Sequence, residues 1–214
     1  MHDLDLDRAI AIDIALEPDA TMAAHAIAVN ARLRSQFPGG FELGETHKPH
    51  ITVLQRFVDG DALDLVATAA RSVIADEDVT AWKLKAVDHN YIAVPPIGVA
   101  AIAVATTDEL HRLQQRLIDA LAPYIVRTGT TAAFVSSVGG TDIQDELISY
   151  VADFVPRSSG EHFHPHVTTG VAAVDYLDQM LQEQFEPVEF TVVGATLYQL
   201  GTYGTAQKHF ETLT

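Results

Sequence analysis

The sequence predicts an α+β fold whose strands form mixed or antiparallel sheets. Segments with strand periodicity and helix periodicity alternate along the chain, and several neighbouring strands are separated only by tight turns. No linker rich in Pro, Gly and Ser, no low-complexity tract and no block of like charge divides the 214 residues. We therefore expect residues 1–214 to form a single domain with two lobes.

In the first half of the chain each expected element has a local signal. The run from Arg8 to Leu16, RAIAIDIAL, is rich in isoleucine and partly alternating, which is typical of a central strand. Asp19 is a good N-cap for the alanine-rich helix that follows it. The elements expected here are a strand at 8–16, a helix at 19–36, a strand at 50–58, a helix at 60–75 with a solvated turn at 76–78, and extended runs at 81–87, 91–94 and 99–105 with turns at 88–90 and 95–98.

The second half begins with a helix that Thr107 caps and Pro123 ends. Residues 124–138 are rich in threonine, serine and β-branched residues and are expected to form a strand or an irregular segment. Residues 156–160, with Arg157 at the tip, are expected to form a flexible surface loop. The other elements expected here are helices at 107–122, 142–154 and 174–185 and strands at 166–171, 188–200 and 207–213.

Composition narrows the possible functions. Cysteine is absent, which removes disulfides, thiolate nucleophiles and cysteine-ligated zinc, and fits a reducing cytosol. The formal net charge of -16 opposes long polyanionic ligands, so a nucleic-acid substrate is expected to be a terminus or a short fragment. The longest apolar run, 92–105, is too short to cross a bilayer, and the N-terminus is acidic where a signal peptide is basic. We expect a cytoplasmic protein with no membrane partner, and a monomer is favoured.

One short pattern occurs twice, as Pro49-His50-Ile51-Thr52 and as Pro165-His166-Val167-Thr168. In a chain with ten histidines the bare His-x-Thr pattern is expected about once by chance, but the flanking proline and the β-branched residue make two copies far rarer. On a strand of period two, the histidine and the threonine face the same side. Two such strands side by side would gather two imidazoles and two hydroxyls, a site for acid-base chemistry on an anion.

These tetrads resemble the paired His-x-Thr motifs of the two-histidine (2H) phosphoesterase superfamily, the LigT-like or RNA 2',3'-cyclic phosphodiesterase group. The resemblance implies two pseudo-symmetric α/β lobes around a central cleft, each giving one motif strand. It also implies hydrolysis of a cyclic phosphodiester, such as the 2',3'-cyclic phosphate of a nucleotide or short RNA end, and permits 2'-5' RNA ligation. Family members have an aromatic residue near the final turn, which here is Tyr198 or Tyr203.

The four predicted catalytic residues are His50, Thr52, His166 and Thr168. One neutral imidazole can accept a proton from water while the other, protonated, gives a proton to the departing ribose oxygen. The threonine hydroxyls can donate to non-bridging phosphate oxygens. This chemistry needs neither a metal nor a cofactor, and we expect none. The residues themselves do not show which of the two histidines is the acid and which is the base. The resemblance favours His166 as the base in hydrolysis.

Other interpretations stay open. His162, His164 and His166 alternate, and His47 lies three residues before His50, so imidazoles could bind zinc or copper in a metallohydrolase, although no HExxH pattern is present. The same cleft could instead bind a phosphorylated ligand or an RNA end without turnover. Each motif could also be an ordinary buried strand.

Four basic residues near the motifs are candidates for a second phosphate or a substrate carboxylate, or are plain surface charges: Lys48, Arg56, Arg157 and Lys208. Arg56 is the best of them, because it lies four residues past Thr52, so strand alternation places both side chains on the same side. It is not included in the predicted catalytic set.

Overall fold

Eight strands form one sheet in which every described pairing is antiparallel, which confirms the predicted α+β class. The structure, a computed structural model, describes residues 8–135 and 143–214. The strands are β1 (Ala9–Pro18), β2 (Ile51–Asp59), β3 (Lys83–Val94), β4 (Ile97–Val104), β5 (Ile125–Val126), β6 (His166–Ala173), β7 (Val188–Leu200) and β8 (Ala206–Thr212). The α-helices are α1 (Ala20–Gln36), α2 (Leu63–Glu77), α3 (Asp108–Leu121), α4 (Asp145–Ala152), α5 (Phe154–Ser158) and α6 (Val174–Met180).

The strand order is β1-β2-β6-β4-β3-β7-β8, with β5 beside β2 and a further pairing between β1 and β7. The long strand β7 joins two groups of elements, because residues 188–191 pair with β3 and residues 192–199 pair with β1. We call β1, β2, β5, β8, α2 and α3 the first lobe, and β3, β4, β6, α1 and α6 the second lobe. The lobes therefore share one continuous sheet.

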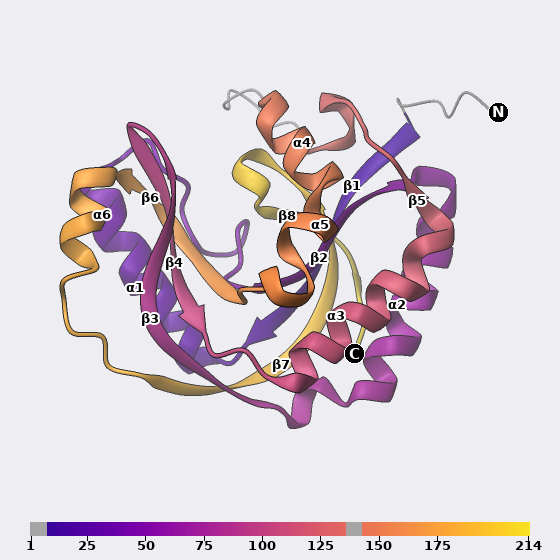
Figure 1. Cartoon of the computed structure of the whole chain (residues 1–214), viewed down its shortest axis with the longest axis horizontal. Helices are drawn as coiled ribbons and strands as arrows, with labels where there is room; N and C mark the ends of the chain where they lie inside the picture. The colour runs from indigo at the N-terminus through magenta and orange to yellow at the C-terminus, as the bar shows by residue number, and fades with distance from the viewer. Residues whose placement is uncertain (1–7, 136–142) are drawn as a thin grey trace.

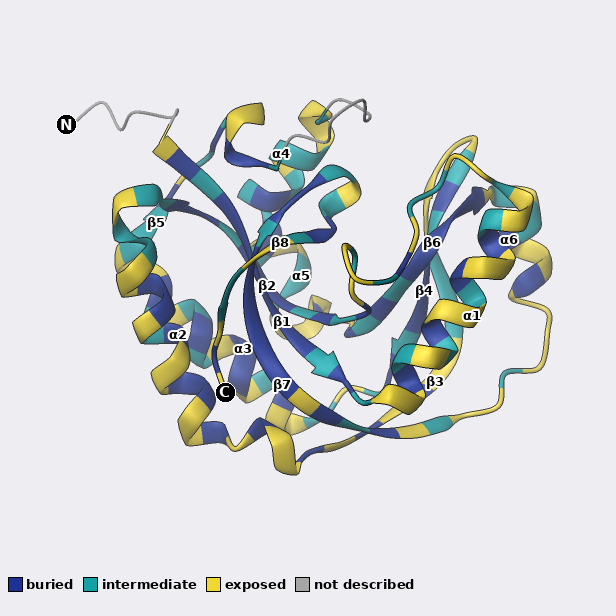
Figure 2. Cartoon of the chain, turned by 180° about the vertical axis from the view of Figure 1, so that it is seen from behind, coloured by how far each residue is buried: buried dark blue, intermediate teal, exposed yellow. Residues whose placement is uncertain are grey.

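Helices cover the outer side of each lobe (Figure 1). α1 and α6 lie against the β3-β4-β6 part of the sheet, and α2 and α3 lie against the part made by β1 and β2. In α3 the side chains of Leu110, Leu113, Leu117 and Leu121 recur at helical spacing and are fully buried. Figure 2 shows the same pattern throughout, with buried residues on the strands and on the inner sides of the helices. Within the described residues, every helix is too short or too polar to cross a membrane.

Both predicted helix caps are present. The Asp19 carboxylate accepts hydrogen bonds from the backbone N–H groups of Thr21 and Met22 at the start of α1. The same carboxylate accepts from the backbone N–H of Thr191 at 2.8 Å, so the cap also fixes α1 to β7. Thr107 caps α3 by accepting from the N–H of Leu110. A capping bond of this kind contributes about 1 kcal/mol.

Two predicted turns are wrong. Residues 88–90 continue β3 without a break, and a register shift between Ala86 and Asp88 replaces the turn with a β-bulge. Asp76 and Glu77 belong to the last turn of α2 rather than to a solvated turn. The Glu77 carboxylate is buried, and it accepts hydrogen bonds from Arg112 and Arg116 of α3. These bonds join the two helices. The acidic composition of 76–78 did not reveal these partners.

The predicted loop at 156–160 is also wrong in part, because Phe154–Ser158 form α5 and Gly160–His162 form a 3-10 turn. Pro156 is tolerated there since it lies in the first turn, where backbone N–H groups have no helical acceptor. The predicted helix at 174–185 ends at Met180. The stretch 124–138 is described as far as residue 135, where it contains the two-residue strand β5 and a 3-10 turn at Thr131–Ala133; its residues 136–138 lie outside the described part. The first residue of the helix predicted at 142–154 lies outside it too, and α4 begins at Asp145.

Candidate active site

The two motif strands meet at one residue pair. β2 and β6 run antiparallel with Ile51 opposite Val167, and both of these side chains are fully buried on one face of the sheet. Because side chains alternate along a strand, the residues on either side of each point to the other face. That face carries the four motif side chains, all partly exposed: His50, Thr52, His166 and Thr168. The structure thus brings the predicted site residues together, and their catalytic role stays a prediction.

Both motif histidines are held by the backbone in the same way. Nδ1 of His50 donates to the carbonyl of Lys48 at 2.7 Å, and Nδ1 of His166 donates to the carbonyl of His164 at 2.8 Å. A carbonyl oxygen only accepts, so each Nδ1 carries a proton. The nitrogen that gains and loses a proton is therefore Nε2 in both rings, which suits proton transfer to and from a ligand.

A β-bulge follows each motif directly. The pairing of β2 with β1 skips Val53, and the pairing of β6 with β4 skips Thr169. In each case a buried amide from the covering helix donates to the carbonyl of the bulged residue: Gln114 Nε2 of α3 to Val53 at 3.0 Å, and Asn30 Nδ2 of α1 to Thr169 at 2.8 Å. The two halves of the site are thus built alike, down to the support of the bulge.

The bulge overturns the expectation for Arg56. Without it, Arg56 would share a face with Thr52. With it, Gln55 pairs with Asp13 on the site face, whereas Arg56 pairs with Ile12 and points to the opposite face. There, burial lowers the pKa of the Arg56 guanidinium.

The carboxylate of Asp13 lies beneath the first motif and was missed by the sequence analysis. Asp13 is 0% exposed in the middle of β1. Its Oδ2 accepts from Thr52 Oγ1 at 2.9 Å and from Gln55 Nε2 at 3.2 Å, and lies 3.4 Å from His50 Nε2. A signal was present in the sequence, because Asp13 is the one acidic residue inside the apolar run at 8–16.

The two imidazoles have opposite electrostatic environments. Burial lowers the pKa of His50, but the Asp13 carboxylate, the Lys48 carbonyl and the Glu17 carboxylate outweigh it, so the pKa of His50 is raised above the ordinary 6.5. Burial also lowers the pKa of His166, and the hydrogen bond to its backbone partner does not compensate. The positive charge of His50 lowers it further, so the pKa of His166 is below 6.5. The site therefore favours the protonated form of His50 and the neutral form of His166, each relative to an ordinary histidine.

A second carboxylate, Glu17, lies farther along β1. Its Oε1 accepts from Tyr198 Oη at 2.6 Å and from Thr196 Oγ1 at 2.8 Å. Burial raises the pKa of Glu17, but these two hydroxyls and the charge of Lys48 outweigh it, and the pKa is lowered. Burial and Glu17 together raise the pKa of the Tyr198 phenol. The Tyr198 ring lies 6.4 Å from the His50 ring, so this cluster adjoins the motif site.

The other basic candidates have partners of their own. Arg157 pairs with Asp153 of the preceding turn at 3.1 Å, so it does not tip a free loop. The Lys208 ammonium lies over the Phe210 ring, 5.1 Å from its centroid. Lys48 acts on the site through its carbonyl and through its charge on Glu17.

The alternating histidines do not gather. Of His162, His164 and His166, only the last lies on β6, because the strand begins there. Burial lowers the pKa of His47, whose ring lies beside Phe41. Across residues 8–135 and 143–214, no three histidine, aspartate or glutamate side chains come together as a metal site.

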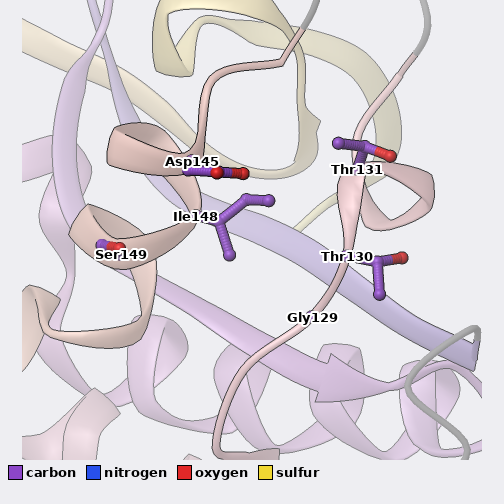
Figure 3. A pocket seen from close by; sticks show the side chains of 6 residues that line it. All are labelled: Gly129, Thr130, Thr131, Asp145, Ile148 and Ser149. Carbon is purple, nitrogen blue, oxygen red and sulfur yellow. The ribbon is translucent and has the colours of Figure 1, made fainter.

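A shallow pocket lies away from the motifs, between the segment at 129–131 and the start of α4 (Figure 3). It is lined by Gly129, Thr130, Thr131, Asp145, Ile148 and Ser149. Its one charged side chain is the Asp145 carboxylate, and it contains no imidazole or basic group. This lining does not suit a phosphate, so the pocket is not the site for the chemistry of the motifs.

The sequence matches the family model of the 2'-5' RNA ligase superfamily over residues 23–204. The chain belongs to that superfamily. Its fold is similar to the crystal structure of TT0787 of Thermus thermophilus, with a TM-score of 0.55, 16% identity and coverage of 95% of this chain and 96% of the other. Lower similarity is found to E. coli LigT complexed with 3'-AMP, with a TM-score of 0.47, 13% identity and coverage of 95% and 97%. No curated protein matches the sequence.

Membership of the 2'-5' RNA ligase superfamily confirms the resemblance inferred from the two tetrads. The matched region contains both motifs, and it begins after β1, so Asp13 and Glu17 lie outside it. Membership supports phosphoesterase or ligase chemistry in general terms.

Proposed function

We propose that this superfamily member hydrolyses a cyclic phosphodiester, the 2',3'-cyclic phosphate of a nucleotide or of a short RNA end, without a metal. The observation that carries the proposal is the contrast between two imidazoles on one face of adjacent strands. His50 lies beside a buried carboxylate and has a raised pKa, whereas His166 has a lowered pKa. One group that holds a proton and one that accepts a proton are what hydrolysis of a phosphodiester requires.

The proposed roles follow from these proton states. Nε2 of His166 accepts a proton from water as the water oxygen forms a bond to phosphorus. The bond from phosphorus to one ribose oxygen breaks, and Nε2 of His50 gives its proton to that oxygen. The product is a phosphomonoester, and exchange of protons with solvent restores both histidines. Each proton transfer contributes about 10²- to 10⁴-fold in rate.

A hydroxyl donor is proposed to stabilise the charge on the non-bridging oxygens. Thr168 lies across from His50 on the paired strand, as antiparallel pairing around Ile51 and Val167 requires. Its hydroxyl has no described hydrogen-bond partner in the site. A preorganised donor of this kind is commonly worth about 10²- to 10³-fold in rate.

Tyr203 is the better of the two aromatic candidates for contact with a base. Tyr198 is 3% exposed and its hydroxyl is bonded to Glu17, whereas Tyr203 is 38% exposed. The loop that carries Tyr203 is fixed to the site, because Gln55 Nε2 lies 3.5 Å from the carbonyl of Gly204. The ring of Phe41 lies 6.2 Å from that of Tyr203 and can provide a second apolar surface.

The charge of the site favours a small substrate with one negative charge. Asp13 and Glu17 both lie near His50, and the formal net charge of the chain is -16. A cyclic phosphodiester carries a single negative charge, whereas long RNA requires many Lys and Arg contacts. A mononucleotide or a short end therefore fits this site better than a polymer.

The test is phosphorus NMR of purified protein with 2',3'-cyclic nucleotides, run with and without EDTA. We expect conversion to one phosphomonoester at the same rate in both samples, because the proposed groups are side chains. Loss of turnover with EDTA would indicate a metallohydrolase. Binding of the cyclic nucleotide by calorimetry without any product would indicate a binding module. Either result would overturn the proposal.

A further inference from the structure

The two motif strands can be superimposed residue for residue through the pair Ile51 and Val167. The pairings of β2 with β1 and of β6 with β4 have the same register, including the skipped residue after each threonine. Under this correspondence the neighbours of the first motif match those of the second as follows: Ala15 with Ala101, Gln55 with Val171, and Asp13 with Val99. The backbone is repeated, but a carboxylate and an amide on one side are replaced by two valines on the other.

We propose that Asp13 is a positioning residue that commits His50 to the role of acid and thereby fixes the direction of proton flow through the site. The role of His50 as the acid rests on the proposed function, whereas the effect of Asp13 on the proton state of His50 does not depend on turnover. Asp13 does not face the substrate. It acts through His50 and Thr52, both of which it contacts.

The geometry around Asp13 supports this role. One oxygen, Oδ2, meets the hydroxyl of Thr52, the amide of Gln55 and the ring nitrogen of His50. A fully buried carboxylate is costly unless it has hydrogen bonds and a nearby positive charge. Thr52 and Gln55 supply the bonds, and a protonated His50 supplies the charge. At 3.4 Å the contact with His50 Nε2 is longer than the other two, so this nitrogen can release its proton to a ligand.

The other ionisable groups around His50 do not reproduce this effect. They are Glu17 on β1, Lys48 beside the motif, His164 and His166 on the β6 side, Tyr198 on β7, and Tyr150 on α4, whose phenol interacts electrostatically with Asp13. Glu17 is the one other carboxylate among them, and its Oε1 is bonded to Thr196 and Tyr198. Asp13 is therefore the group whose removal changes His50 most.

A second consequence concerns the threonines. The Thr52 hydroxyl donates its hydrogen to Asp13, and a hydroxyl has only one hydrogen to donate. The donor for a phosphate oxygen is then Thr168 alone. The two threonines of the repeated motif would have different functions, one supporting the acid and one contacting the substrate.

Because the two motifs correspond residue for residue, a substitution at one can be matched by the opposite substitution at the other. Asp13→Asn removes the carboxylate from the first motif, and Val99→Asp installs a carboxylate at the corresponding half-buried position of the second. Asp178→Asn, on the exposed face of α6, controls for the loss of any carboxylate. Histidine titrations by NMR are measured on the unliganded proteins, so their outcome does not depend on finding the right substrate.

We expect the midpoint of His50 to fall in Asp13→Asn, the midpoint of His166 to rise in Val99→Asp, and neither to move in Asp178→Asn. In activity, Asp13→Asn should lose more kcat/KM at about pH 8 than at about pH 6, because the acid loses its proton at a lower pH. Val99→Asp should lose more at the lower pH, because the base keeps its proton to a higher pH. If Asp13→Asn fails to fold, Val99→Asp still decides. An unchanged His50 midpoint in folded Asp13→Asn, or an unchanged His166 midpoint in folded Val99→Asp, would overturn the inference.

Thr52→Val and Thr168→Val separate the two hydroxyls. Thr52→Val should move the His50 midpoint while Thr52→Ser restores it, because Thr52 acts through Asp13. Thr168→Val should lower kcat/KM at every pH and leave the His50 midpoint in place. Equal effects of the two valine substitutions on the titration would contradict the assignment. If the histidine midpoints move as expected but the protein shows no turnover, the inference about Asp13 stands and the proposed function is wrong.

Discussion

The first and second motifs share a backbone and differ in what surrounds them. Each has a histidine tied to the carbonyl two residues earlier, a bulge directly after the threonine, and a buried helix amide on the bulged carbonyl. Around His50, however, β1 provides Asp13 and Glu17, whereas around His166 the corresponding strand β4 provides Val99 and alanine.

This difference shows how a repeated motif can supply two opposite functions. The shared backbone places equivalent Nε2 atoms toward one site. The unshared neighbours then move the two pKa values in opposite directions from 6.5. In the proposed mechanism an acid and a base are obtained from the same kind of side chain, because the environment of each imidazole, and not the motif, sets its pKa.

The largest expected effect is the loss of either imidazole. His50→Ala and His166→Ala should each lower kcat by about 10²- to 10⁴-fold, since each removes one proton transfer. Circular dichroism should show that both variants fold, because both side chains lie on the partly exposed face of the sheet. Full turnover by either folded variant would contradict the assignment of an acid-base pair.

The next largest effect is expected at the two motif threonines, whose substitutions should lower activity by different amounts. Thr168→Val should lower kcat/KM on a 2',3'-cyclic nucleotide by about 10²-fold, as expected for removal of one donor to the developing charge. Thr52→Val should lower kcat/KM less than Thr168→Val does at about pH 6, because Thr52 is proposed to act on His50 through Asp13 and not on the phosphate. Steady-state kinetics of the two variants side by side would test this, and a larger loss for Thr52→Val at that pH would reverse the roles.

Substitution of Asn30 and Gln114, whose amides bond the two bulged carbonyls, tests what the two halves of the site have in common. Asn30→Leu should lower the free energy of unfolding by about 2–4 kcal/mol, because it removes three hydrogen bonds, to Thr169, Phe41 and Leu43, in a buried place. Gln114→Leu should cost about 1–3 kcal/mol, since it removes two, to Val53 and Ser158. Urea denaturation measures both. A neutral result for either would show that the bulge does not need its amide.

The smallest effect is expected at the aromatic residues. Tyr203→Ala should raise KM for a cyclic nucleotide by about 5- to 150-fold through the loss of base stacking worth about 1–3 kcal/mol, with little change in kcat. Tyr198→Phe keeps the buried ring and removes only the hydroxyl bonded to Glu17. It should leave KM close to that of the wild type. The reverse pattern would identify Tyr198 as the residue in contact with the base.

Sequence reasoning predicted what depends on local signals. Strand alternation and capping residues gave β1, α1, β2, α3, β6 and β7 nearly within their bounds, and the repeated tetrad gave the four motif residues. Bulges have no comparable signal, so the faces of Gln55 and Arg56 were not predictable from parity. The role of Asp13 depends on which strand lies beside β2, and that pairing is a property of the whole fold.

The most direct test of the account is the pH dependence of kcat/KM of the wild-type protein on a 2',3'-cyclic nucleotide. We expect a bell-shaped profile whose acid limb lies below 6.5, because His166 must lose a proton, and whose alkaline limb lies above 6.5, because His50 must keep one. The acid limb should disappear in His166→Ala and the alkaline limb in His50→Ala. A profile without two limbs, or limbs unaffected by these substitutions, would contradict a base and an acid supplied by the two motifs.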